Sequence, residues 1–164
     1  MVKSRFEEMR LRFSLSRLGR FLGVDKISVD VTGNEELTRF LVHKGHFRKD
    51  RVHPSGILPM YNERKNRWET SGHRTGGLRP RHIWLLGYRY VESEGRHIRA
   101  RGFGAVSLVT NLGLGFEVNG EPYPRHADIV GWHDDKNQRQ MKALDLANKM
   151  QLEMDPRSEA RAKS

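Results

Sequence analysis

The sequence predicts an α+β fold: a mostly antiparallel sheet with a short internal helix or two, and a long C-terminal helix packed on one face. Two observations favour it. Short apolar segments alternate with polar residues and are separated by Gly and Pro, whereas one longer stretch near the C-terminus has helical spacing. We expect a single domain over residues 1–155 and a flexible, charged tail over residues 156–164.

The N-terminal part contains two alternating segments. Residues 9–16 alternate apolar side chains with Arg or Ser, which predicts a strand, although leucines spaced between residues 11 and 22 also fit a basic amphipathic helix. Residues 27–31 alternate again and predict a strand. After a turn, acidic residues followed by His43-Lys44 suit the dipole of a short helix, which is expected over residues 35–44.

The middle of the chain predicts a hairpin and then a helix. The segments 60–61 and 68–70 flank the polar run from Asn62 to Arg67, which indicates two strands joined by a basic tip. Pro80 suits the first turn of a helix that contains the apolar run 83–86.

The C-terminal part predicts short strands and one long helix. The segments with extended or short buried character are 98–103, 114–118 and 129–132. Residues 105–112 fit either a helix or a strand. Asp134-Asp135 then supplies a helix cap. The apolar residues that follow at helical spacing are Ala143, Ala147, Met150 and Met154, so the helix is expected to end just before Pro156.

The charge of the chain points to an anionic partner. Thirty Lys and Arg face twenty Asp and Glu, which gives a net charge of +10. Residues 39–101 hold 15 basic and 5 acidic residues, so this region carries the whole excess. Aromatic residues interleave with the basic ones there, as suits phosphate contacts combined with base stacking. We therefore expect nucleic-acid binding, with RNA or single-stranded DNA favoured.

The basic residues expected to contact phosphates form groups along this region. They are Arg48, Lys49, Arg51, Arg64, Lys65, Arg67, Arg79, Arg81 and Arg89. Another interpretation makes the chain an accessory subunit whose basic face docks an acidic protein. A third treats these side chains as a solvated surface over a core that contains the aromatic residues.

A rival hypothesis is a small enzyme that processes phosphodiesters or nucleotides. Its candidate catalytic residues are His53, Glu69, His73 and Arg74. In it, His53 or His73 exchanges a proton, Glu69 orients the histidine, and Arg74 stabilises charge on a phosphate. Residues 125–128, Arg-His-Ala-Asp, form a second polar cluster that either faces the first or pairs locally. No motif establishes catalysis, and binding without catalysis is favoured.

One short segment carries a family resemblance. Residues 101–108 begin Arg-Gly-Phe-Gly and resemble the central-strand signature of RNA recognition motif domains. The resemblance implies a sheet on which RNA bases stack against aromatic side chains. Ala105 and Leu108 stand where that family places aromatic residues, so two of the stacking rings are missing. The alternative is an ordinary strand that leads through a Gly turn into the core.

The composition and the spacing of the histidines also indicate which metal sites, cofactors and cellular compartments to expect. Cysteine is absent, which excludes disulfides and thiolate metal sites and fits a reducing cytoplasm. His43 and His46, with His53 nearby, lack the partner spacing of a metal motif, so neither a metal nor a cofactor is expected. No apolar run has the length of a signal core or a membrane span, and we expect a cytoplasmic protein.

Overall fold

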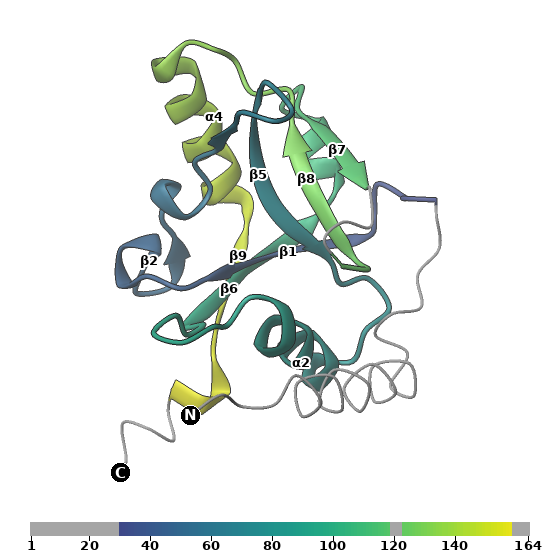
Figure 1. Cartoon of the computed structure of the whole chain (residues 1–164), viewed down its shortest axis with the longest axis vertical. Coiled ribbons are helices and arrows are strands. Elements are labelled where there is room, and N and C mark those ends of the chain that lie inside the picture. Colours follow the sequence, from purple (N-terminus) through teal and green to yellow (C-terminus); the bar gives the residue numbers. More distant parts are fainter. Residues whose placement is uncertain (1–29, 119–122, 159–164) are drawn as a thin grey trace, which may run out of the picture.

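The computed structural model describes residues 30–118 and 123–158, and in these ranges helices pack around one antiparallel sheet (Figure 1). The sheet order is β7-β8-β5-β1-β6-β9, and β4 also pairs with β5. The strands of this sheet are β1 (Glu36–Leu41), β4 (Met60–Asn62), β5 (Arg67–Arg74), β6 (Ala100–Ala105), β7 (Gly115–Val118), β8 (His126–Val130) and β9 (Gln151–Met154). A separate small hairpin consists of β2 (Phe47–Arg48) and β3 (Arg51–Val52).

The helices complete the predicted α+β fold, which the structure confirms. They are the α-helices α2 (Pro80–Tyr90), α3 (Ser107–Thr110) and α4 (Lys136–Lys149), and the 3-10 turns η1 (Lys44–His46) and η2 (Pro54–Gly56). Pro80 occupies the first turn of α2, as expected. Residues 105–112 fitted either a helix or a strand, and the structure has the short helix α3 there. The strand or helix predicted within residues 9–22 lies outside the described ranges, as do residues 27–29 of the strand predicted over 27–31, while residues 30 and 31 are described and belong to no strand.

The helix predicted over residues 35–44 is wrong, because residues 36–41 form β1 at the centre of the sheet. β1 pairs with β6 from Glu36, opposite Ala105, to Leu41, opposite Ala100. Its side chains are buried on both faces of the sheet, since Leu37 packs in one core cluster and Phe40 in the other. Packing on two faces overrides the weak helical preference of the local charge pattern.

The C-terminal helix is also shorter than predicted. α4 ends at Lys149, and Met150 already has extended backbone angles. Residues 151–154 then form β9, which pairs with β6. The strand β9 satisfies backbone groups on β6 that a continued helix would leave unpaired.

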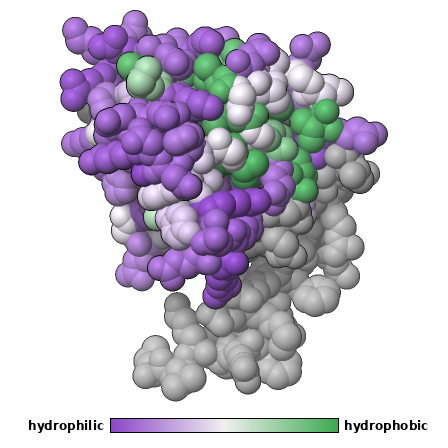
Figure 2. All heavy atoms as spheres, turned by 90° about the horizontal axis from the view of Figure 1, so that it is seen from above, coloured by the Kyte–Doolittle hydropathy of each residue, from purple (hydrophilic) through white to green (hydrophobic). Residues whose placement is uncertain are grey.

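The sheet has helices on both faces. On one face the main core joins Leu37 and Ile129 to Leu146 of α4, and on the other Phe40 packs with Trp84 of α2. α4 and α2 cover different parts of the sheet (Figure 1). On the face that Figure 2 shows, hydrophilic side chains cover most of the described surface, with a smaller hydrophobic area among them. Within the described ranges, no helix is long and apolar enough to cross a membrane.

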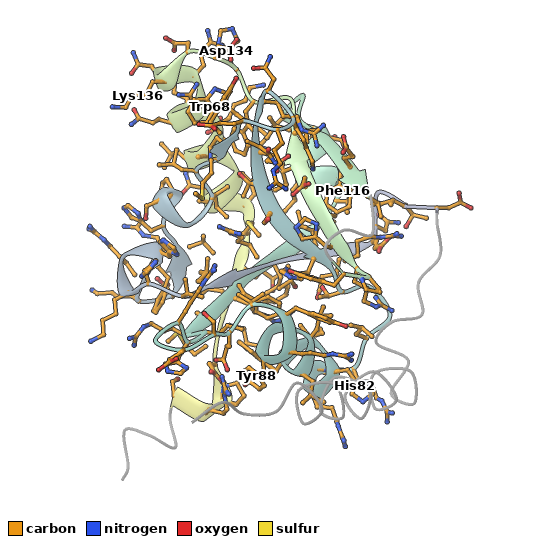
Figure 3. The ribbon with its side chains drawn as sticks, in the orientation of Figure 1. Trp68, His82, Tyr88, Phe116, Asp134 and Lys136 are labelled. Atoms are coloured by element: carbon orange, nitrogen blue, oxygen red, sulfur yellow. The ribbon has the colours of Figure 1, made fainter. Side chains whose placement is uncertain are left out.

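Arg139 and Trp68 tie α4 to β5. The Arg139 guanidinium lies 3.7 Å from the centre of the Trp68 ring and donates to the carbonyl oxygen of His133 at 2.9 Å. Figure 3 shows Trp68 near the end of α4 where Asp134 and Lys136 are labelled. This contact combines a cation–π interaction with satisfaction of backbone acceptors before the helix.

The chain after β9 packs against α2, although the sequence predicted a flexible tail from residue 156 onward. Tyr88 Oη donates to Asp155 Oδ1 at 2.7 Å, and Arg157 pairs with both Asp155 and Glu92. The Arg157 guanidinium lies 3.3 Å from the centre of the Tyr88 ring, which Figure 3 labels on α2. Residues 155–158 are therefore held to the body of the protein.

Replacing Asp135 by alanine should lower the free energy of unfolding by about 1 kcal/mol. The Asp135 carboxylate accepts a hydrogen bond from the Gln138 backbone N–H at 2.9 Å and so caps α4. Urea unfolding of Asp135→Ala measures the loss. The neighbouring Asp134→Ala is the control, and equal destabilisation by both variants would contradict the assignment of the cap to Asp135.

Candidate functional site

Part of the sheet face that packs on α2 remains open and forms a cleft. Two adjoining hollows of about 470 and 660 Å³ share a set of lining residues. The shared residues are Arg39, Asn62, Arg64, Glu69, Ser71 and Arg96. Because β5 supplies two of them and lies beneath both hollows, the combined space is called the β5 cleft below.

The alternation of β5 and its pairing with β8 place the polar side chains of the cleft. Glu69, Ser71 and His73 are two residues apart on β5 and so face the same side. Ser71 pairs in register with Asp128, and His73 pairs with His126. Directly opposed residues of an antiparallel pair project from the same face, which brings these four side chains together.

A serine, a histidine and an aspartate are in contact in the cleft. Ser71 Oγ lies 3.0 Å from His126 Nε2, and the same nitrogen lies 3.6 Å from Asp128 Oδ1. The Ser71 side chain is exposed to the cleft, whereas His126 and Asp128 are buried. The arrangement differs from a hydrolase triad because the carboxylate approaches the nitrogen that also contacts serine. It nevertheless combines a hydroxyl, a proton acceptor and a nearby negative charge.

His73 and Tyr123 form one wall of the cleft. His73 Nε2 lies 2.7 Å from Tyr123 Oη, and the Tyr123 ring stacks on the His73 ring and on Tyr90. Burial, with smaller effects of His126 and Arg39, lowers the pKa of His73 to about 3. Burial also raises the pKa of Tyr123 to about 12. At neutral pH the Tyr123 hydroxyl therefore donates to an uncharged His73.

Two of the basic side chains near the cleft are neutralised by carboxylates. Lys65 Nζ lies 2.9 Å from Asp128 Oδ2 and 3.3 Å from Glu69 Oε2. Arg67 forms a two-pronged pair with Glu117 at 2.6 and 2.8 Å. The hydrogen bond to Asp128 is the main reason that the pKa of Lys65 is raised. These cations organise the cleft and have little charge left over for an added anion.

Three arginines at the cleft have no such neutralisation. Among the described residues, no carboxylate lies within ion-pair distance of Arg39, Arg64 or Arg96. Arg39 Nη1 donates to the Ser71 carbonyl oxygen at 2.8 Å, and its Nε donates to that of Gly56 at 3.1 Å. Burial, and then the charge of Arg96, lower the pKa of Arg39 to about 10. Two backbone carbonyls thus hold a positive charge in the cleft.

Protein-family models, curated proteins and solved structures give no match to the chain.

The structure brings together two of the four predicted catalytic residues. Glu69 and His73 both line the β5 cleft. His53 lies at η2, where its Nδ1 is 2.8 Å from Ser55 Oγ, and neither residue lines the cleft. Arg74 follows His73 on β5 and so projects to the opposite face, where it is buried against Glu35.

The predicted phosphate contacts are spread over separate surfaces. Arg64 and Lys65 line the cleft, and Arg67 lies beside it on β5. The remaining predicted contacts do not line it: Arg48, Lys49 and Arg51 belong to the β2–β3 hairpin, and Arg79, Arg81 and Arg89 lie on or next to α2.

Sequence reasoning missed several residues of the cleft. Arg39 and Arg96 lie in the basic region, yet no motif marks them. The polar cluster at 125–128 was the signal for the histidine–aspartate pair. Of its two interpretations, the one in which it faces the cluster around Glu69 and His73 is correct for His126 and Asp128. The exposed Ser71 has no signal beyond its place between Glu69 and His73.

Two other sequence hypotheses concern residues outside the cleft. Within the described ranges, no three His, Asp or Glu side chains gather as a metal site, and the His43 and His46 rings simply contact each other. In the segment that resembles RNA recognition motifs, residues 101–105 belong to β6, between β1 and β9, and residues 107–108 begin α3. Its Arg101 is buried in ion pairs with Glu36 and Glu153, and its guanidinium lies over the Phe103 ring.

Proposed function

We propose that the protein binds single-stranded nucleic acid, RNA or DNA, with phosphates in the β5 cleft. The observation that carries this proposal is the convergence of Arg39, Arg64 and Arg96 without carboxylate partners among the described residues. A guanidinium offers paired N–H donors that match the oxygens of a phosphate. Because Arg39 is partly desolvated, an anion in the cleft would offset the cost of burying its charge.

The aromatic side chains of the cleft favour a nucleic acid over an inorganic anion. Tyr61 is exposed in the hollow of about 660 Å³, and the rings of Tyr90 and Tyr123, which stack on each other, line the hollow of about 470 Å³. Exposed rings next to cations stack on unpaired bases while the cations contact the backbone. The net charge of +10 would add long-range attraction to any polyanion. A single strand supplies both the phosphates and the free bases.

The proposal is tested by comparing two double variants with the same loss of charge. Arg64→Gln/Arg96→Gln removes two exposed arginines from the cleft, and Arg48→Gln/Arg51→Gln removes two from the β2–β3 hairpin. Fluorescence anisotropy with labelled single strands of RNA and DNA measures the affinity. We expect a loss of about a hundredfold or more for the cleft variant, because each of its two charged contacts contributes about 1.5–3 kcal/mol. The hairpin variant should lose less than about threefold, through screened long-range attraction only.

The salt dependence provides a second measurement on the same variants. For a single strand the log–log slope changes by about 0.7 per phosphate neutralised, so removing two contacts should reduce it by about 1.4. Equal losses of affinity in both double variants would mean that the β5 cleft is not the binding site. If the wild-type protein shows no binding and no salt dependence, nucleic-acid binding itself is excluded, and docking of an acidic protein becomes the better interpretation.

A further inference from the structure

We propose that Ser71 is a nucleophile and His126 its general base, so that the β5 cleft cleaves phosphodiester bonds. The inference rests on the proposed function, since its substrate is the phosphodiester that the cleft arginines hold. It extends that function from binding to catalysis.

The contacts of Ser71 and His126 suit this chemistry. The Ser71 hydroxyl is exposed to the cleft and lies 3.0 Å from His126 Nε2, within reach for proton transfer. The reaction requires the tautomer with the proton on Nδ1, in which Nε2 accepts the hydroxyl proton. The buried Asp128 carboxylate, 3.6 Å from Nε2, then stabilises the imidazolium that forms. Lys65 holds the other oxygen of this carboxylate in place.

Cleavage would follow two balanced steps. In the first, Ser71 Oγ attacks phosphorus while its proton passes to His126 Nε2; the bond from phosphorus to the leaving oxygen breaks, and His126 returns the proton to that oxygen. In the second, His126 takes a proton from water, whose oxygen attacks the phosphoserine. The bond between phosphorus and Ser71 Oγ breaks, and the serine recovers its proton from His126.

The arginines would stabilise the charge that develops on the phosphoryl oxygens. Arg39 is fixed beside the nucleophile, because its Nη1 donates to the carbonyl oxygen of Ser71 itself. Arg96 lines the same cleft. Cations that are already in position when negative charge accumulates lower the barrier more than mobile ones do.

A second serine–histidine pair in the chain provides a matched comparison. Ser55 Oγ lies 2.8 Å from His53 Nδ1 but donates its proton to the carbonyl oxygen of Gly45, also at 2.8 Å. Neither Ser55 nor His53 lines the β5 cleft. The Ser55 hydroxyl proton is therefore engaged by a backbone carbonyl, and Ser55→Ala should leave turnover unchanged.

The test measures turnover and binding separately. Bis(4-nitrophenyl) phosphate and labelled single strands of RNA and DNA are incubated with the wild-type chain, Ser71→Ala, His126→Gln and Ser55→Ala, with and without a divalent-metal chelator. We expect cleavage in the presence of the chelator, and a loss of about 10²- to 10⁴-fold in Ser71→Ala and in His126→Gln. Ser71→Ala should keep the affinity for the strands. Acid quenching followed by peptide mass spectrometry should find a phosphoryl adduct on Ser71 of the wild-type chain.

The outcomes separate this inference from the proposed function. Binding without wild-type turnover, or turnover unchanged by Ser71→Ala, would overturn the catalytic role while leaving the binding proposal intact. Absence of binding would overturn both. If His126→Gln does not fold, Ser71→Ala alone decides the matter, because Ser71 is exposed and its substitution should barely alter stability.

Discussion

Replacing Arg74 by alanine should lower the free energy of unfolding by about 3–5 kcal/mol, the usual cost of removing one partner from a buried ion pair. The Arg74 side chain is 1% exposed. Its Nε and Nη2 donate to the two Glu35 oxygens at 2.7 and 2.8 Å, and Nη2 also donates to the carbonyl oxygen of Asp30 at 3.0 Å. The alanine variant would leave Glu35 largely buried without its cation. Urea unfolding at neutral pH measures the change.

The control removes both charges at once. Arg74→Met/Glu35→Leu replaces the pair with apolar side chains and should recover most of the stability lost in Arg74→Ala, because neither charge is left unpaired. A double variant as unstable as the single one would show that the backbone bond to Asp30, or packing, dominates instead. Full stability of Arg74→Ala would contradict the structural role altogether.

The structural role of Arg74 follows from the alternation of side chains along β5. The sequence placed His73 and Arg74 in one candidate site because they are adjacent in the chain. On β5, adjacent residues project to opposite faces, so the cleft receives Glu69, Ser71 and His73 while Arg74 enters the other side. The hairpin was predictable from its apolar segments and polar tip, but its second strand extends further than the predicted 68–70.

Elements with strong local signals were predictable, and those defined by long-range pairing were not. Pro80 indicated the start of α2, and Asp135 indicated the start of α4. β1 and β9 exist because each pairs with β6, and neither local sequence reveals that partner. A helix with suitable end charges was therefore expected for residues 35–44, where the sheet requires a central strand.

The site shows the same division. Arg64, Lys65, Glu69 and His73 could be proposed because they are neighbours on or near one hairpin. The rest of the cleft depends on β5 lying between β1 and β8, which brings Arg39 and His126 to its two sides. The charge count also overstates the free cations, because Lys65 and Arg67 are neutralised by carboxylates.

The free energy of unfolding should fall by about 2 kcal/mol between pH 7 and pH 5 through His73 alone. Burial lowers the pKa of His73 from its ordinary 6.5 to about 3 in the folded protein. Between these two values the unfolded chain binds a proton that the folded chain does not, so acid favours unfolding. The contribution is absent above pH 7 and grows as the pH falls toward 3. His46, whose pKa burial lowers to about 4, acts in the same direction.

Urea unfolding at pH 7 and pH 5 of the wild-type chain, His73→Gln and His97→Gln separates this contribution from the others. Glutamine cannot titrate but can still accept a hydrogen bond from Tyr123, so the pH-dependent loss in His73→Gln should be smaller by about 2 kcal/mol. His97 is exposed and serves as the control for the replacement of a histidine. If the free energy of unfolding changes equally between pH 7 and pH 5 in all three proteins, His73 is protonated in the folded state at pH 5. The Tyr123 hydroxyl would then have no acceptor on the His73 ring at that pH.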